Sequence, residues 1–481
     1  MSQSMITGRP PYKMIAVLLV GAFIALLNNT LLGIAIPAIM EDFHVNAATA
    51  QWLTTGYMLV NGILIPVTAY FIQKYSIRRL FLVAIGLFIT GTLVAGTAQL
   101  FSVLLVGRMI QASGAAVMSP LLTNVMLVSF PIEKRGTAMG VTGFVMMGAP
   151  AIGPLLSGWM VQYFDWRMLF FMIAPVAILI LLAGFFIIKD KKEKKDTRLD
   201  VLSLIFSSIG FGGILYGFSS AGNSGWSHPT VYGMILVGAL SLTLFILRQQ
   251  KQKTPMLNFA IFKYPMYSLS ITISMIVAMT LFSSMIMIPI YFIDLRGIPS
   301  LNAGLMMIPG AIILAVSSPI VGRLFDKFGG RVLALIGLSI ITITSYYFSQ
   351  LTFETTYSHL IFLNAIRMLG ISMVMMPVST TGFNQLPKPL YPHGTAMNNT
   401  MQQVSGATGT ALLVTIMSIR TEYHAKYLKE ASNVNEQVMD QAMLAGINDA
   451  FFTAIFFSAG ALALAMFLKP AKQEEHGSRQ G

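Results

Sequence analysis

The sequence contains no cysteine among its 481 residues, which excludes disulfide bonds, thiol catalysis and cysteine-based metal sites. Charge is also scarce, because Asp, Glu, Lys and Arg together make up 10% of the chain, whereas soluble domains carry about 25%. A chain with so little charge cannot cover a water-facing surface. The sequence lacks a phosphate-binding P-loop, so we expect no direct use of ATP. Its six histidines show no metal-ligand spacing. We therefore expect neither a metal nor a cofactor, and no enzymatic activity.

Hydrophobic residues make up 55% of the chain and gather in fourteen long apolar segments. Their approximate bounds are 14–36, 51–72, 80–98, 102–128, 136–161, 167–188, 200–219, 230–247, 267–292, 300–322, 332–350, 357–380, 394–419 and 447–468. Segments of about this length cross a lipid bilayer as helices. The expected fold class is therefore an all-α integral membrane protein with fourteen transmembrane helices. Residues 1–13 lead into the first segment without a small-residue cleavage site, so we expect no removable signal peptide.

The basic residues are distributed unequally between the two sides of the membrane. An even number of spans places both termini on one side. If that side is cytoplasmic, 24 of the 31 basic residues lie in cytoplasmic segments, five lie outside, and Arg108 and Arg367 lie within spans. Positive residues favour the cytoplasmic side, so we predict a multi-pass protein of the cytoplasmic membrane with both termini inside. The net charge of +13 then reflects topology, and nucleic acid is not an expected partner.

An internal repeat divides the chain. Residues 69–79 follow the second span, and the similar basic turn 322–332 follows the tenth, about 253 positions later. Arg108 and Arg367, each near a glycine, form a second pair 259 positions apart. Two similar offsets imply two six-helix bundles related by an axis along the membrane normal, with the seventh and eighth spans as two extra central helices. The expected divisions are 1–188 (first bundle), 189–264 (cytoplasmic linker and two inserted helices), 265–468 (second bundle, with an external, partly helical loop 420–446) and 469–481 (cytoplasmic tail).

Several segments carry a family resemblance. They are Gly/Pro-rich 148–158 in the fifth span, 165–170 before the sixth, the turn 322–331, and 394–399 in the thirteenth. With these motifs in order along nearly the whole chain, the sequence resembles the fourteen-span drug:proton antiporter branch of the major facilitator superfamily, the EmrB/QacA and LmrB-like multidrug exporters.

The resemblance implies a major facilitator fold and the export of lipophilic or amphiphilic drugs in exchange for protons by alternating access, a basis for antibiotic resistance. It also implies a monomer. The chain departs from the family pattern in two places: Asn28 stands where the first span often carries an aspartate, and Gln73 stands where the first cytoplasmic turn usually carries an acid.

The buried arginines are the first candidates for proton coupling or for the charge balance of a cavity. An arginine within a span is costly and normally faces a partner or a watery cavity. Arg108, with Gln111 one helical turn later, has this role by resemblance, and Arg367 is its repeat counterpart. The alternative is a structural arginine bonded to Gln111 or to backbone carbonyls. Asn28 and Asn29 can hydrogen-bond substrate or Arg108 without titrating.

No carboxylate lies in the middle of a predicted span, although the chain has eighteen. A proton antiporter needs a titratable group that both faces can reach in turn. Asp294, at the outer end of the ninth span, is the best remaining candidate. Its alternative role is a solvated ion pair with Arg296.

The fifth span has the composition of a helix that bends or packs closely. Gly148, Gly153 and Gly158 recur at five-residue intervals, and Pro150 and Pro154 each remove a backbone hydrogen bond. Small residues let membrane helices approach closely. We interpret the segment as a gating hinge between two moving halves. The alternative is an ordinary helix-packing seam.

The second basic turn predicts a cytoplasmic latch formed by Gly322, Asp326, Gly329 and Arg331. A carboxylate favours a helix N-terminus, so Asp326 is expected to cap or pair across the turn before the eleventh span. By resemblance the latch stabilises one access state. The alternative is that its basic residues only signal topology.

Methionine is abundant, with 33 residues, and clusters such as 146–147, 306–307 and 373–376 suit an adaptable pocket for lipophilic molecules. Alternatively, most of these side chains face lipid or the bundle core. Two other functions stay open. One is an exporter of a specific metabolite, or a facilitator without proton coupling, with the same fold. The other is a membrane enzyme or sensor, which the absence of a catalytic constellation disfavours.

Overall fold

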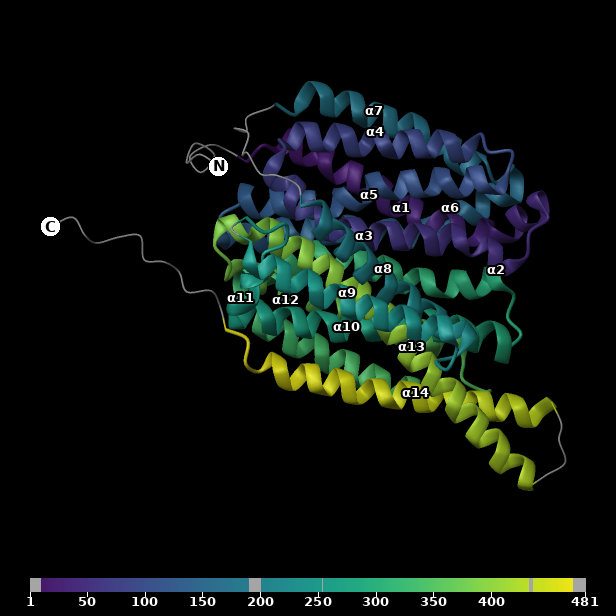
Figure 1. Ribbon diagram of the computed structural model, residues 1–481. Coiled ribbons are helices and arrows are strands. Elements are labelled where there is room, and N and C mark those ends of the chain that lie inside the picture. The colour runs from purple at the N-terminus through teal and green to yellow at the C-terminus, as the bar shows by residue number, and fades with distance from the viewer. Residues whose placement is uncertain (1–9, 190–199, 253, 432–435, 470–481) are drawn as a thin grey trace.

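The computed structural model describes residues 10–189, 200–252, 254–431 and 436–469, and every regular element in these ranges is a helix (Figure 1). Each predicted apolar segment lies in a helix with at most a few residues outside it, although two of them share one helix and the last two helices extend well beyond the predicted bounds. Eleven helices of the described ranges are long and apolar enough to cross a bilayer. The all-α membrane fold predicted from the sequence is therefore confirmed.

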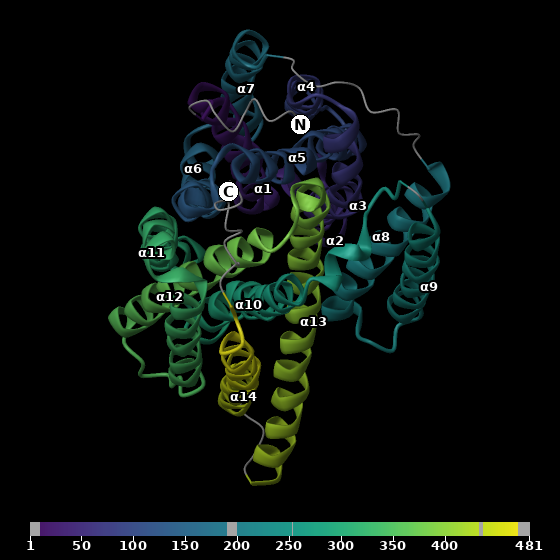
Figure 2. The same ribbon diagram turned by 90° about the vertical axis from the view of Figure 1, so that its left-hand side faces the viewer.

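The first half holds six long helices and comes from the N-terminal part of the chain. Its elements are α1 (Tyr12–Phe43), α2 (Ala47–Ala50), α3 (Trp52–Lys74), α4 (Ile77–Gly96), α5 (Phe101–Ser129), η2 (Ile132–Lys134), α6 (Arg135–Tyr163) and α7 (Met168–Ile187). The helices of this half gather on one side of the bundle in the view along its axis (Figure 2).

The second half lies opposite. Its elements are α10 (Pro265–Ile290), η4 (Tyr291–Leu295), α11 (Ser300–Phe348), α12 (Tyr357–Asn384), η5 (Lys388–Leu390), α13 (Tyr391–Ala431) and α14 (Glu436–Ala465). The predicted tenth and eleventh spans both lie in α11, which is kinked at Gly329, where φ is 77°. That left-handed conformation is one that glycine adopts without steric cost, so Gly329 lets the chain turn back into the membrane.

The two halves meet along two helix pairs. α6 packs on α11, and α3 packs on α13. The α6–α11 contact is very close: a Cβ placed on Gly140 would lie 2.7 Å from the carbonyl oxygen of Ser318, and one on Gly136 would lie 2.5 Å from that of Gly322. Only glycine fits at such distances, so this seam between the halves is built from small residues.

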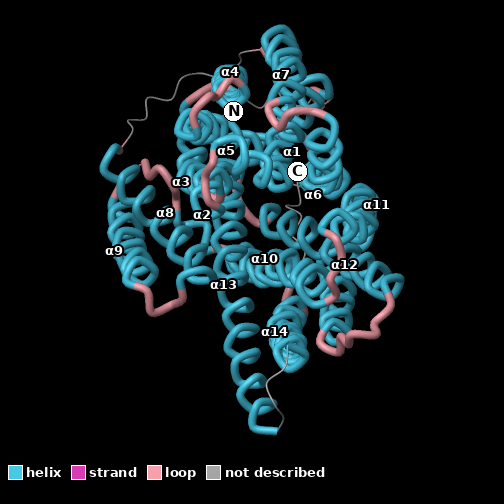
Figure 3. The backbone as a smooth tube through the Cα atoms, turned by 90° about the vertical axis from the view of Figure 1, so that its right-hand side faces the viewer, coloured by secondary structure: helices cyan, strands magenta, loops and turns pink. Residues whose placement is uncertain are grey.

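The inserted helices α8 (Val201–Ser224) and α9 (Pro229–Lys251) are central in the chain but not in space. They lie at one flank of the bundle, where α8 packs on α3 and on α13 (Figures 2 and 3). On the first-half side, Tyr216 stacks on Trp52 with ring centroids 5.8 Å apart. On the second-half side, Nε1 of Trp226 donates to Oγ1 of Thr415 at 2.6 Å. The insertion thus contacts both halves.

Helix α1 begins and helix α14 ends at the same end of the bundle, left in Figure 1. We call this face the terminal side and the opposite face the outer side. On the outer side α13 runs on to Ala431 and α14 begins at Glu436. The helical segments predicted within 420–446 are thereby confirmed, and they project from the bundle as the ends of these two helices; residues 432–435 lie outside the described ranges (Figure 1).

Candidate functional site

A cavity lies between the two halves. Thr123 of α5 and five residues of α6 line it from the first half; residues of α11, α12 and α13 line it from the second. The lining is Thr123, Met139, Thr142, Gly143, Met146, Met147, Leu314, Ser318, Ser372, Met375, Met376, Ser379, Phe383, Asn398, Asn399 and Gln402. Its free volume is about 50 Å³, far below the roughly 300–1,000 Å³ of drug-binding pockets. The halves must separate before the cavity can hold a drug-sized molecule.

The chemistry of this cavity is neutral and adaptable. Five of its residues are methionines, whose flexible thioethers repack around different shapes. Of the methionine clusters noted in the sequence, 146–147 and part of 373–376 line the cavity, whereas Met306 and Met307 pack against the apolar core near the outer side. Hydroxyl groups from α5, α6, α11 and α12 and amide groups from α13 supply the polar contacts.

Arg108 lies fully buried in the first half. Its Nη1 donates to Oδ1 of Asn28 at 2.5 Å and to Oε1 of Gln111 at 2.7 Å, and its guanidinium lies 4.2 Å from the ring centroid of Tyr57. Gln111 in turn donates to Oγ1 of Thr92 at 2.7 Å. The structure therefore brings together three of the residues singled out in the sequence.

Every acceptor that Arg108 has in the described residues is neutral. Its Nε and Nη2 atoms have no hydrogen-bond partner there. Asn29, the fourth residue of the predicted group, is not among the hydrogen-bond partners of Arg108, and its buried Oδ1 has no partner in the described part of the chain. Because guanidinium keeps its proton in proteins, the first half contains a buried positive charge that only dipoles and one aromatic ring stabilise.

Arg367, the predicted repeat counterpart of Arg108, lies fully buried in the second half and has different partners. Its Nη1 donates to Oγ of Ser345 at 2.8 Å, and its Nη2 donates to Oγ of Ser284 at 2.9 Å. Phe348 and Phe451 flank the guanidinium at 5.7 and 5.9 Å. The repeat thus preserves a fully buried arginine, while hydroxyl groups replace the amides of the first half.

Asp326 joins the two halves on the terminal side. Its carboxylate accepts the backbone N–H of Gly136 at 2.7 Å, the N–H of Thr137 at 2.8 Å and the hydroxyl of Thr137 at 2.5 Å. These groups form the first turn of α6, where a carboxylate is favoured by the free N–H groups and the helix dipole. The local capping expected before the eleventh span is wrong, because α6 offers these donors directly opposite.

The other latch residues take different places. Gly322 lies in the α6–α11 seam, Gly329 forms the kink, and the side chain of Arg331 is exposed. A second contact between the halves lies next to Asp326: Nη1 of Arg135 donates to Oδ1 of Asn384 at 2.8 Å. Nothing in the sequence marked Arg135 as an interface residue.

A third contact on the terminal side involves a histidine that sequence reasoning missed. The side-chain amide of Gln73, on α3, lies 2.5 Å from Nε2 of His393, on α13, and the backbone N–H of Asn258 donates to Nδ1 at 3.1 Å. Burial lowers the pKa of His393 to about 4. Gln73 occupies in the first half the repeat position of Asp326, and this equivalence was the available signal for a contact at α13.

The predicted hinge residues all lie in α6, a single helix between α1 and α11. Gly148 faces Ala315 of α11, and a Cβ on it would lie 3.3 Å from the Ala315 methyl group. Gly153 faces Thr30 of α1 so closely that a Cβ there would overlap the hydroxyl. Pro150, Pro154 and Gly158 lie on the same helix. The segment thus contacts both halves, and bending at it stays a prediction.

Asp294 lies exposed at the outer side in the π-helical turn η4. Its expected partner, Arg296, instead donates to the carbonyl oxygen of Thr355 at 2.9 Å and to the hydroxyl of Tyr291 at 3.0 Å. Asp294 is not among the residues that line the central cavity.

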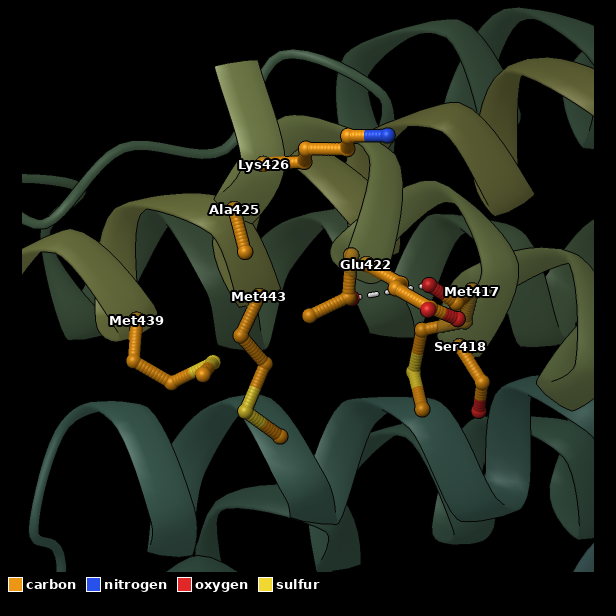
Figure 4. A pocket seen from close by; sticks show the side chains of 8 residues that line it. Met417, Ser418, Glu422, Ala425, Lys426, Met439 and Met443 are labelled. Atoms are coloured by element: carbon orange, nitrogen blue, oxygen red, sulfur yellow. Dashed lines mark hydrogen bonds between the residues drawn. The ribbon is translucent and has the colours of Figure 1, made fainter. Parts of the chain in front are cut away.

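A larger groove of about 540 Å³ lies on the outer side between the projecting ends of α13 and α14 (Figure 4). Met417, Glu422, Lys426, Met439 and Met443 are among its lining residues. One half alone forms this groove, so relative motion of the halves does not alternate its access. We therefore assign the functional site to the smaller central cavity, which both halves line.

Two helical halves around a shared cavity, closed at one face by contacts between them, define a membrane transporter fold. The sequence model of the Major Facilitator Superfamily matches residues 18–410, and the chain belongs to this family.

Individual proteins are similar over nearly the full length. The uncharacterized MFS-type transporter YcnB of Bacillus subtilis is 46% identical, over 96% of this chain and 96% of its own length. The lincomycin resistance protein LmrB of Bacillus subtilis is 42% identical, over 95% of this chain and 96% of its own length. The crystal structure of the human organic anion transporter MFSD10 (TETRAN) superposes with a TM-score of 0.65 at 12% identity, covering 94% of this chain and 100% of that one, which supports the fold alone.

Proposed function

We propose that this protein exports lipophilic or amphiphilic drugs across the cytoplasmic membrane by alternating access, in exchange for protons. It acts as a monomer of fourteen spans with both termini in the cytoplasm. Support comes from relatives named for drug resistance and export, among them LmrB and, at 23% identity, the multidrug export protein EmrB of Haemophilus influenzae. The unequal distribution of basic residues supports the orientation.

One observation supports alternating access most directly. Both halves line the cavity. Three separate contacts between the halves close its terminal side: Asp326 of α11 with the first turn of α6, Arg135 with Asn384, and Gln73 with His393. Contacts that cross only the interface stabilise one access state and must break in the other. With cytoplasmic termini, this is the state closed toward the cytoplasm.

The candidate residues take distinct roles in this proposal. The glycines and prolines of α6 form the hinge, Asp326 with its α6 donors forms the cytoplasmic latch, and Arg108 with Asn28 and Gln111 takes part in proton coupling. The proposal needs no cofactor or metal.

Drug accumulation in cells provides the test. Cells that express the protein are expected to accumulate less drug than cells expressing Gly153→Leu at equal membrane abundance. An ionophore that collapses the proton gradient is expected to abolish the difference. Equal accumulation in both strains before the ionophore is added contradicts drug export.

A second candidate is an exporter of a specific metabolite, or a facilitator without proton coupling. The absence of a carboxylate from the middle of any span favours it. Export that persists after the proton gradient is collapsed supports this candidate over proton exchange.

A further inference from the structure

The central cavity offers no charged group to a substrate. Its sixteen lining residues supply thioethers, hydroxyls, amides, an aromatic ring, a leucine and a glycine. Pockets that select organic cations need a negative charge or an open aromatic face to replace the water around the cation. Phe383 is the one aromatic residue among the lining residues described here.

The carboxylates of the described chain lie at the two faces of the bundle, and several are already paired. Asp42 and Asp165 bond Arg167 on the outer side, Asp449 bonds Arg420 there, and Asp200 bonds Arg248 on the terminal side. Asp326, the carboxylate at the contact between α6 and α11, already accepts three hydrogen bonds from donors of α6. None of these paired carboxylates is free to attract a cation, and no carboxylate is among the residues that line the cavity.

The buried charges between these faces are positive. Arg108 and Arg367 are both fully buried, and all their acceptors in the described residues are neutral. Nε of each arginine has no partner in that part of the chain. Along their helices, Arg108 and Arg367 lie between the outer ends of α5 and α12 and the cavity-lining residues Thr123 and Ser372. A buried charge is weakly screened, so these two guanidinium groups raise the potential on the outer side of the cavity.

From this charge arrangement we infer that the cavity selects against positive charge: its substrates are neutral or anionic amphiphiles, and permanent organic cations are excluded. The inference rests on the proposed export function and specifies its substrate class. An anion gains from both arginines, a neutral molecule needs only the methionines and amides, and a cation is opposed by both arginines with no carboxylate to compensate.

Two probes of nearly equal size and opposite charge test the selection. Tetraphenylphosphonium and tetraphenylborate are offered to energised everted membrane vesicles, with uncharged chloramphenicol as a third probe. Vesicles carrying the Gly153→Leu variant supply the background. Protein-dependent uptake of tetraphenylborate is expected to exceed that of tetraphenylphosphonium at least about ten-fold. Uptake of the cation at an equal or higher rate overturns the inference, as does uptake of chloramphenicol with uptake of neither ion. Absence of uptake of all three probes overturns the export function instead.

A single substitution tests the cause. Asn28→Asp places a carboxylate at the atom that now lies 2.5 Å from Nη1 of Arg108, which neutralises that charge. Tetraphenylphosphonium uptake is expected to rise at least about three-fold relative to tetraphenylborate. The matched control is Asn46→Asp, the same change at an exposed side chain that accepts the N–H of Thr49 at 2.8 Å, as an aspartate also can. An unchanged ratio in Asn28→Asp, or an equal rise in Asn46→Asp, contradicts the role of the buried arginine.

Discussion

Replacing Asp326 by asparagine is expected to loosen the terminal side. The carboxylate accepts three hydrogen bonds from the first turn of α6, two from backbone N–H groups and one from a hydroxyl. Asparagine removes the charge and one acceptor oxygen. Because Asp326 is exposed, we take only the low end of the range for charge-assisted hydrogen bonds, about 1.5 kcal/mol. That energy changes the ratio of closed to open molecules about ten-fold.

The absence of native cysteine makes this shift measurable. A single cysteine at Ser379, which lines the cavity and is 7% exposed, reacts with a membrane-impermeant maleimide only when the terminal side opens. Everted vesicles present that side to the reagent under the proposed topology. Labelling of Ser379→Cys is expected to be about ten-fold faster when combined with Asp326→Asn, since the rate follows the open fraction.

Two variants complete the series. Thr137→Ala removes only the hydroxyl donor, so the expected acceleration is about two-fold. Asp165→Asn removes an exposed carboxylate from the outer side, where it pairs with Arg167 at 3.5 Å, and labelling is expected to stay unchanged. A rate for Asp326→Asn within two-fold of the parent refutes the latch, as does a response to Asp165→Asn of the same size.

Three further predictions follow from the packing and the titrating groups. Gly153→Leu is expected to reduce export to background because its side chain displaces α6 from α1, whereas Gly86→Leu, where a Cβ meets nothing within 4 Å, retains export; equal export by both variants contradicts the close approach. Arg108→Lys is expected to lower export at least about ten-fold at equal abundance, since one ammonium cannot reproduce the contacts of the guanidinium to both amides. Export at the rate of the unsubstituted protein would show that a lysine can replace the arginine at this position. Burial in the closed state lowers the pKa of His393 to about 4, whereas an exposed histidine has a pKa of about 6.5. The neutral ring therefore favours the closed state fully above about pH 6.5, and this contribution is lost as the pH falls from there toward about 4. Labelling of Ser379→Cys, normalised to free cysteine, is therefore expected to accelerate on acidification, and His393→Gln removes this dependence; an identical pH profile in both proteins excludes His393 as its origin.

The sequence predicted the architecture well because the bilayer imposes a simple rule. A long apolar run must form a helix when no water can satisfy its backbone, so the positions of the helices could be predicted from composition alone. The offset between the two basic turns predicted a repeat. Neither signal could place α8 and α9 at a flank, because lipid-facing and protein-facing helices are equally apolar.

The candidate site was less accessible to sequence reasoning. The contact of Arg108 with Gln111 follows from their spacing of three residues on one helix, and its contact with Asn28 was among the alternatives. The partner of Asp326 could not be predicted, because it lies on a helix of the opposite half. The partner of Gln73 follows from the repeat only once the contact of Asp326 with α6 is known. A contact that forms in only one access state leaves little trace in local sequence pattern. His393 was overlooked for the same reason: nothing near it in the chain signals an interface.

The position of α8 at one flank has a consequence for the direction of opening. Stacking of Tyr216 on Trp52 and the bond from Trp226 to Thr415 both lie toward the outer side, and they tie the same helix hairpin to each half. Separation of the halves there strains one of these two contacts. In the described chain no inserted helix connects the two halves beside the α6–α11 pair. Under the proposed alternating access, outward opening is therefore expected to be asymmetric, with the exit for the exported molecule wider on the side away from the inserted helices.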